Sequence, residues 1–417
     1  MPRWRWTLTR LTRRLWVRAS LIGLLGIFAA MLATTAEHLI PMTLPALIGS
    51  ESVSGILNIL ASSMLAVTTF SLSVMTAAYG SATSNVTPRA VRLLVEDRTS
   101  QNVLSTFVGS FLFAMVGIIA LETQSYGERG RLVLFIITLG VLALVVVSLL
   151  RWIDHLTLLG RVSNTTLKVE QATARTLQQR LQNPWLGGKP RGDAAPPANA
   201  RPLLASRIGY VQHLDTNALQ QCAETHGLEI FIDALPGTFV YPDTPLAWLP
   251  LPDELNDSEA LMQKLCAAFT IDHERSYDQD PRFGLVVLSE IASRALSPAV
   301  NDAGTAIDVI GRATRLLSQW ADGSLQPAPA VICPRLWVPG LKDADLFEDA
   351  FWLLARDGAE KIEVQLRLRK ALQALARQGG DTFADAARQQ AQIALARAEE
   401  VLTQEHERVR LRAIELA

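Results

Sequence analysis

ILNILASSMLAVTTFSLSVMTAAYG, residues 56–80, is the stretch that decides the fold. It contains no Asp, Glu, Lys, Arg or His, and it is longer than the roughly 20 residues that a helix needs to cross about 30 Å of hydrocarbon. Inside a bilayer the backbone must satisfy its own hydrogen bonds, so a helix is the expected form. Residues 56–80 therefore predict a membrane-spanning helix.

Further apolar stretches without charged residues or His flank it at residues 19–36, 104–121 and 132–150. A cleaved signal peptide is the rival interpretation of 19–36, because arginines precede it, but more apolar stretches follow where a soluble domain would begin. A mean hydropathy of +0.21, with 49% hydrophobic and 19% charged residues, agrees with an integral membrane protein. We predict a membrane α-helical fold with four transmembrane helices within 19–152 and a cytoplasmic α+β domain.

The positions of Lys and Arg predict the orientation. Arginines are concentrated in the tail 1–18 and after the second span, whereas the loop 37–55 contains no Lys or Arg. Positively charged loops favour the cytoplasmic side, so both termini of this multi-pass protein are expected in the cytoplasm. The lipid bilayer is then the partner. The net charge of −1 gives no reason to expect a nucleic acid.

A polar stripe follows one face of the second span. Its members recur at helical spacing, and they are Asn58, Ser62, Thr69, Ser73 and Thr76. In one interpretation the small side chains let helices pack closely and the hydroxyls bond across helices. In the other, several copies of this helix surround an aqueous pathway that the stripe lines. Both interpretations stay open on the sequence alone.

Charged residues follow this span where Pro88 kinks or restarts the helix. Arg89 and Arg92 are expected near the cytoplasmic mouth of the span. There they can concentrate anions or contact lipid phosphates, or they can be ordinary residues of a positively charged inner loop.

The remaining chain divides by composition. Residues 153–182 continue the apolar periodicity of the fourth span and predict its cytoplasmic extension. Residues 183–202 are rich in Pro and Gly and predict a flexible linker. Residues 203–252 alternate between strand patterns and turns, and they predict a small strand-rich module. Residues 253–417 show helical patterns and predict a helical cytoplasmic region.

Two motifs in that last region identify a resemblance. They are Asp-Pro-Arg-Phe-Gly at 280–284 and Ser-Pro-Ala-Val-Asn-Asp at 297–302. With the Phe-Ser-Leu-Ser-Val run at 70–74, they make nearly the whole chain resemble the family of bacterial predicted membrane proteins known as domain of unknown function 2254. Ala303 and Gly304 depart from the family's usual Pro and small polar residue at that turn. The resemblance implies a membrane protein, expected in the bacterial inner (cytoplasmic) membrane, and no particular activity.

The charged residues of these motifs have a structural and a functional interpretation. Those at the first motif can form an ion-pair network around a turn, and those at the second can cap a helix. Clustered carboxylates with an amide also suit a hard cation or another ligand. The residues concerned are Arg275, Asp278, Asp280, Arg282, Asn301 and Asp302.

No nucleophile elbow, phosphate loop or zinc-hydrolase motif is present, so an enzyme is not expected. Cys222, Cys266 and Cys333 do not have the spacing of a metal site, and we expect no metal or cofactor. The leading hypothesis is a homo-oligomeric, channel-like pore for ions or small solutes, with the second span at its centre and a cytoplasmic regulatory domain. The alternative is a membrane-anchored scaffold or sensor whose cytoplasmic domain binds a ligand or a protein. The absence of charges inside the spans disfavours a secondary transporter.

Overall fold

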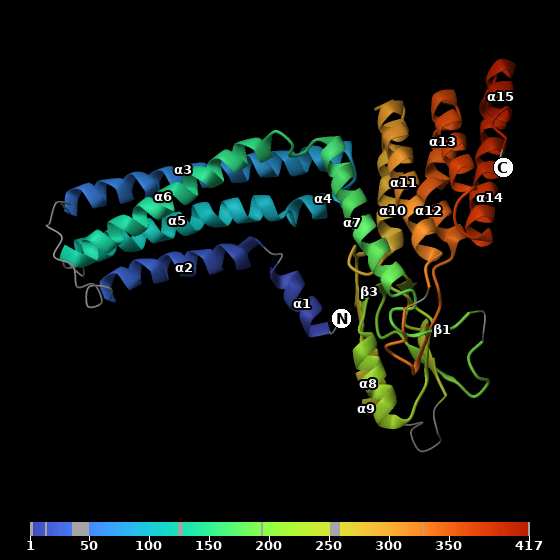
Figure 1. Ribbon diagram of the computed structural model, residues 1–417, viewed down its shortest axis with the longest axis horizontal. Helices are drawn as coiled ribbons and strands as arrows, with labels where there is room; N and C mark the ends of the chain where they lie inside the picture. Colours follow the sequence, from blue (N-terminus) through green and yellow to red (C-terminus); the bar gives the residue numbers. More distant parts are fainter. Residues whose placement is uncertain are drawn as a thin grey trace. The chain divides into compact units, whose positions relative to one another are not determined.

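The computed structural model describes residues 3–12, 15–35, 50–123, 128–192, 195–250, 259–327 and 329–415. These residues form two compact units (Figure 1). The first, called here the apolar unit, comprises residues 7–84 and 91–165. The second, called here the C-terminal unit, comprises residues 1–6, 85–90 and 166–417.

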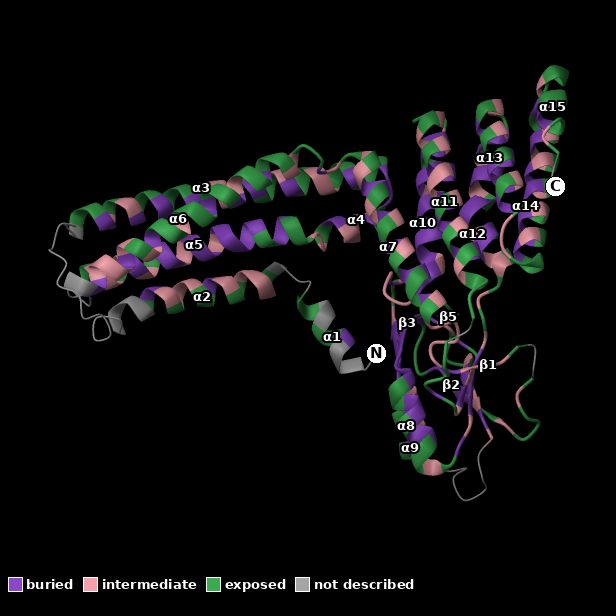
Figure 2. Cartoon of the chain, in the orientation of Figure 1, coloured by how far each residue is buried: buried purple, intermediate pink, exposed green. Residues whose placement is uncertain are grey.

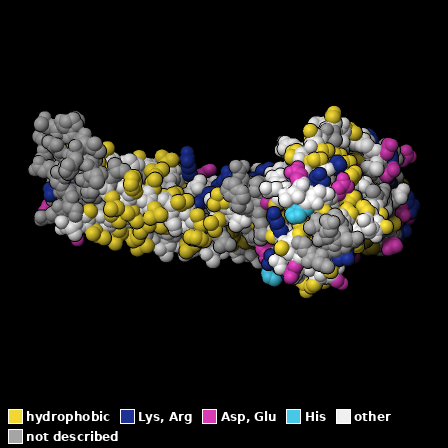
Figure 3. Space-filling model, turned by 90° about the horizontal axis from the view of Figure 1, so that it is seen from below, with side chains coloured by type: hydrophobic (Ala, Val, Ile, Leu, Met, Phe, Trp, Pro, Cys, Tyr) yellow, Lys and Arg dark blue, Asp and Glu magenta, His cyan; other side chains and the backbone are white. Residues whose placement is uncertain are grey.

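The helices up to residue 156 are α1 (Arg3–Thr12), α2 (Leu15–Thr35), α3 (Ser50–Asn85), α4 (Pro88–Val95), α5 (Arg98–Glu122) and α6 (Glu128–Leu156). Among the described residues, three segments are long and apolar enough to cross a membrane, Glu51–Asn85, Arg98–Glu122 and Gly130–Leu156. They contain the spans predicted at 56–80, 104–121 and 132–150. Figure 3 shows hydrophobic side chains over much of the visible face of this unit.

The span predicted at 19–36 is not among these three segments. The apolar part of α2 is Trp16–Met31, which at about 1.5 Å per residue is roughly 24 Å long and short of about 30 Å of hydrocarbon. Residues 36–49 lie outside the described residues. A fourth transmembrane helix therefore remains a prediction.

Helix α5 is the central helix of the apolar unit. Of its apolar window 56% is buried, against 28% for α3 and 22% for α6 (Figure 2). Glycines let α2 approach α5, because a Cβ on Gly26 would lie 2.9 Å from the carbonyl oxygen of Gly109. Small residues at such contacts are typical of helices that pack inside membranes.

The predicted continuous extension 153–182 of the fourth span is wrong in one respect, because the helix is interrupted. Helix α6 ends at Leu156, and a separate helix α7 (Val162–Gln182) follows. Gly160 lies between them with a φ of +77°, a left-handed conformation that glycine adopts without steric cost. Gly160 lies in the turn between the two helices, two residues before Val162, and the apolar periodicity of the sequence does not reveal this break.

Two sheets form the strand-containing part of the C-terminal unit. One has the strand order β1-β8-β4-β6-β2, and the other has the order β5-β3-β7. The strands are β1 (Lys189–Pro190), β2 (Arg201–Leu204), β3 (Gly209–Leu214), β4 (Ile230–Ile232), β5 (Phe239–Val240), β6 (Pro245–Leu249), β7 (Phe269–Asp272) and β8 (Leu336–Val338). Their buried side chains pack with α8 (Thr216–His226) and α9 (Glu259–Cys266) around one hydrophobic core.

These sheets cross the predicted domain boundaries. Strand β1 lies inside the stretch 183–202 and pairs with β8, so this part of the predicted linker is hydrogen-bonded sheet. Strands β7 and β8 come from the region 253–417, which was predicted to be helical, and complete sheets begun before residue 252. The strand-rich module is therefore not a separate unit.

Helices form the remainder of the C-terminal unit. They are α10 (Pro281–Leu296), α11 (Ala303–Ser324), α12 (Asp343–Asp357), α13 (Ile362–Leu375), α14 (Asp381–Val401) and α15 (Glu405–Arg412). A break at Leu402 separates α14 from α15. Because of this break, Leu402 and Leu411 pack together with Ala398 in one buried apolar cluster. The burial of these side chains stabilises the broken arrangement.

Candidate functional site

The loop from His273 to Asp280 joins β7 to α10 and contains the first sequence motif. Asp280 is the N-cap of α10, and its Oδ1 accepts a hydrogen bond from the backbone N of Phe283 at 3.2 Å. Pro281 follows in the first turn, where its missing N–H costs nothing. The Asp-Pro-Arg-Phe-Gly motif is thus a helix start.

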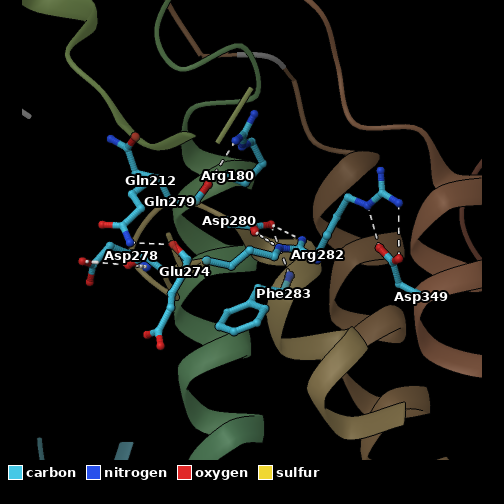
Figure 4. Close-up of polar contacts among 11 residues, drawn as sticks. Arg180, Gln212, Glu274, Asp278, Gln279, Asp280, Arg282, Phe283 and Asp349 are labelled. Carbon is cyan, nitrogen blue, oxygen red and sulfur yellow. Dashed lines mark hydrogen bonds and ion pairs between the residues drawn. The ribbon is translucent and has the colours of Figure 1, made fainter. Parts of the chain in front are cut away.

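Asp280 also holds Arg275 by two hydrogen bonds. Arg275 Nε donates to Oδ2 at 2.7 Å, and Arg275 Nη2 donates to Oδ1 at 3.1 Å (Figure 4). Asp280 is only 2% exposed. Gly237, with a φ of +100°, comes so close that a Cβ there would lie 2.5 Å from Asp280 Oδ2. Both oxygens of the buried carboxylate therefore bind structural partners.

Arg282 turns toward another helix (Figure 4). Its Nη1 donates to Asp345 at 2.7 Å, and its Nη2 donates to Asp349 at 3.2 Å, both on α12. Asp278 bonds elsewhere, since its Oδ2 accepts from Ser276 Oγ at 3.1 Å and from Trp6 Nε1 at 2.9 Å. The predicted single network of four charged residues is therefore divided into separate contacts. Among the described residues no group of three His, Cys, Asp or Glu side chains could hold a metal.

Backbone contacts fix the loop to its surroundings. Gln212 Nε2 donates to the carbonyl of Glu274 at 2.6 Å, and Gln279 Oε1 accepts from the backbone N of Leu214 at 2.9 Å, which ties the loop to β3. Thr176 Oγ1 on α7 donates to the carbonyl of Tyr277 at 2.6 Å. The loop thus connects a sheet, α7 and α10.

The segment 85–90, which directly follows α3, also contacts this region. Glu290 on α10 accepts a hydrogen bond from Thr87 Oγ1 at 3.2 Å and forms an ion pair with Arg89. The Tyr277 hydroxyl donates to the carbonyl of Arg89 at 3.3 Å. The hydrogen bond that the Arg89 guanidinium donates to the Glu290 carboxylate raises the pKa of Arg89 above its ordinary value. Arg92 instead pairs with Glu96 at 2.9 Å within one helical turn.

Sequence reasoning missed Glu290. It lies in a helical stretch without any motif, and its partners precede it by about 200 residues in the chain. The one available signal in the sequence was the helical periodicity. It places Glu290 at a partly exposed position of α10.

The second motif forms a helix start as well. Asp302 is the N-cap of α11, and its carboxylate accepts from the backbone N of Thr305 at 3.0 Å and from Thr305 Oγ1 at 2.6 Å. These hydrogen bonds lower the pKa of Asp302. Asn301 has a φ of +53° and accepts a hydrogen bond from Lys361 Nζ. Asn tolerates this left-handed conformation better than most residues, so both residues shape the turn.

The polar stripe of the second span lies on the exposed side of α3. All five of its members, Asn58, Ser62, Thr69, Ser73 and Thr76, are exposed within the protein chain. Each of the hydroxyls donates to the carbonyl four residues earlier in α3, at 2.8–3.1 Å. The opposite side of α3, with Leu57, Leu60 and Met64, is buried in the apolar unit.

Comparison with known proteins places the chain in a family. Uncharacterized proteins of Mycobacterium tuberculosis and Mycobacterium bovis are 27% identical to it over 277 residues, which is 65% of this chain and 53% of theirs. The chain therefore spans about half the length of these relatives. No solved structure matches. The model of the DUF2254 family, described as predicted membrane proteins, matches residues 12–374. The chain therefore belongs to the DUF2254 family of predicted membrane proteins.

Proposed function

We propose that this membrane protein is a homo-oligomeric, channel-like pore for ions or small solutes. In this proposal the polar stripe of α3 faces the centre of the oligomer. The C-terminal unit lies on the cytoplasmic side and regulates the pore through the segment 85–90. The protein is not proposed to be an enzyme.

The observation that carries this proposal is the contrast between α3 and its neighbours. In α5 and α6 the hydroxyl side chains of Ser105, Ser110, Thr138 and Ser148 are buried inside the apolar unit. The exposed positions of α6 from Ile136 to Leu150 are all apolar or glycine, which suits contact with lipid. Within the predicted spans 56–80, 104–121 and 132–150, only α3 has several polar side chains at exposed positions.

The residues beside the stripe fit the same arrangement. At about 100° per residue, Leu65 and Leu72 lie along one edge of the stripe, and Ile59 and Phe70 lie along the other. In a ring of subunits the stripe would face the axis, and the apolar edges would contact neighbouring subunits. A single chain cannot surround a path with one such face, so several copies are required.

The contacts of Glu290 support a regulatory role for the C-terminal unit. Glu290 holds Thr87 and Arg89, which follow α3 directly. A rearrangement of the loop 273–280 or of α10 would therefore act on the chain immediately after the stripe-bearing helix.

Cysteine accessibility tests the proposal. Single variants Ser62→Cys, Thr69→Cys and Thr76→Cys are made in a protein without Cys222, Cys266 and Cys333, reconstituted in liposomes and treated with a charged, membrane-impermeant thiosulfonate. We expect all three positions to react, because the stripe faces water.

Two matched controls accompany these variants. Leu139→Cys on the apolar face of α6 and Thr138→Cys inside the apolar unit should not react. If the stripe positions are as unreactive as both controls, and neighbouring subunits instead cross-link through them, the stripe packs helices together. The proposal then fails in favour of a membrane-anchored scaffold or sensor.

A further inference from the structure

Arg180, close to the end of α7, is a buried cation with incomplete bonding. It is 3% exposed. Its Nη2 donates to the carbonyl of Gln279 at 3.3 Å, and its Nη1 has no hydrogen-bond partner among the described residues. In Figure 4 the other end of the guanidinium is turned away from Asp280. Desolvation lowers the pKa of Arg180 to about 10, so the group is still charged at neutral pH.

No carboxylate among the described residues forms an ion pair with this guanidinium. Asp280 is the acid whose charge acts on Arg180 and raises its pKa. However, the oxygens of Asp280 already bind Arg275 and cap α10. A buried charge without a direct counterion destabilises a protein in general. An anion that reached Arg180 would remove that cost and complete the bonding of Nη1.

Arg180 forms part of the wall of a cavity of about 910 Å³. The cavity lies between α7, the C-terminal end of α11 and the segment around Pro327. Its walls include the apolar and aromatic side chains of Leu177, Leu181, Trp185 and Trp320. The exposed side chains of Arg175 and Asp322 lie at its rim. This size is typical of small-molecule sites, in which apolar walls and a few polar groups orient the ligand.

The geometry points to a binding site for a small organic anion at this cavity, with a carboxylate or phosphate on Arg180 and an apolar or aromatic body between Trp185 and Trp320. The inference stands independently of the proposed pore, because every residue of the site belongs to the C-terminal unit. The anion can be a soluble metabolite or the headgroup of an acidic lipid, since both present the same chemistry to arginine.

Binding of a chosen probe tests this site. Full-length protein in nanodiscs of phosphatidylcholine is titrated with 1-naphthyl phosphate, and its unfolding temperature is followed. We expect a saturable rise, and no rise with uncharged 1-naphthol. Arg180→Met should weaken the apparent affinity about tenfold to a hundredfold, as expected for a charge-assisted hydrogen bond. Arg175→Met at the rim should change it less than threefold.

The variants also separate a ligand site from a structural role. Arg180→Met should unfold at the same temperature as the unliganded wild type or above it, because it removes a buried charge that has no direct counterion. Arg180→Lys keeps the charge and should retain part of the response. In nanodiscs with phosphatidylglycerol, a stabilisation that needs no probe and disappears in Arg180→Met would assign the site to a lipid headgroup. A lack of response in wild type, or an equal response in wild type and Arg180→Met in both kinds of nanodisc, would overturn the inference.

Discussion

Gly284 of α10 touches Thr173 of α7 so closely that a Cβ on the glycine would lie 1.8 Å from Thr173 Oγ1. No rotamer of the glycine's replacement can avoid this contact, because the Cβ itself is fixed by the backbone. Residue 284 closes the Asp-Pro-Arg-Phe-Gly motif, so the motif also sets the approach of two helices.

Gly284→Ala should therefore destabilise the C-terminal unit by about 1–3 kcal/mol, the usual cost of overpacking a well-packed site. The check is the unfolding midpoint of the purified full-length protein. The matched control is Gly311→Ala in α11, where a Cβ would meet only the ends of arginine side chains, 3.7 Å or more away. That change should be neutral or stabilising by up to about 1 kcal/mol. Adding Thr173→Ala to Gly284→Ala should restore part of the stability, and equal losses in the two glycine variants would contradict this account.

Replacing either capping aspartate, Asp280 or Asp302, by alanine should lower the free energy of unfolding, and the two losses should differ strongly. Asp280→Ala removes the buried partner of the partly buried Arg275 and should cost about 3–5 kcal/mol, as for other broken buried ion pairs. Asp302→Ala removes an exposed cap and should cost about 1 kcal/mol. Chemical denaturation of both variants beside wild type measures the difference. A loss for Asp280→Ala no larger than that for Asp302→Ala would show that the pair with Arg275 adds nothing.

The lowered pKa of Asp302 predicts that its contribution to the stability of the protein depends on pH. Because its pKa is lowered in the folded protein, its contribution to stability is present above the unfolded pKa and is lost as the pH falls through the folded pKa. Wild type should therefore be more stable than Asp302→Asn at pH 7, and the difference should shrink below about pH 4. Thermal unfolding of both proteins at several pH values provides the measurement. A difference that does not change with pH would rule out the charge as its origin.

The Arg89–Glu290 ion pair should show a small energetic coupling. The Arg89 side chain is 58% exposed and that of Glu290 is 22% exposed, and such pairs contribute about 0–1 kcal/mol. A double-mutant cycle with Arg89→Gln and Glu290→Gln isolates this coupling from the cost of each change. If the pore proposal holds, Glu290→Gln should alter flux through the reconstituted protein while leaving its stability nearly unchanged. Unaltered flux would argue against regulation through the segment 85–90.

Much of the apolar unit follows from composition. The apolar windows around 56–80, 104–121 and 132–150 predict their helices because length and hydropathy are local properties of the chain. The stripe on α3 was also visible as a periodicity. The exposure of the stripe could not be predicted from the sequence. Whether the polar face of α3 turns inward depends on which face of α3 packs against α5.

The C-terminal unit was less predictable for an equally physical reason. Strands such as Lys189–Pro190 and Leu336–Val338 are very short, and their pairing depends on residues more than a hundred positions away. Helix starts at Asp280 and Asp302 were readable, since capping is local. The partners of Arg282, Arg89 and Arg180 were not, since each lies on a different element.

The position of β8 between β1 and β4 also dictates when the sheet can be completed during synthesis. Strands β1 and β4 are both hydrogen-bonded to β8 and not to one another. A nascent chain that has just released β4 from the ribosome must be extended by roughly 100 more residues, which takes about 5–20 seconds at ordinary translation rates. Throughout that interval both strands present open edges of the kind that promotes association between chains. The apolar helices α3, α5 and α6 are by then already synthesised, and the edges of β1 and β4 that pair with β8 stay open until residue 338 has been added.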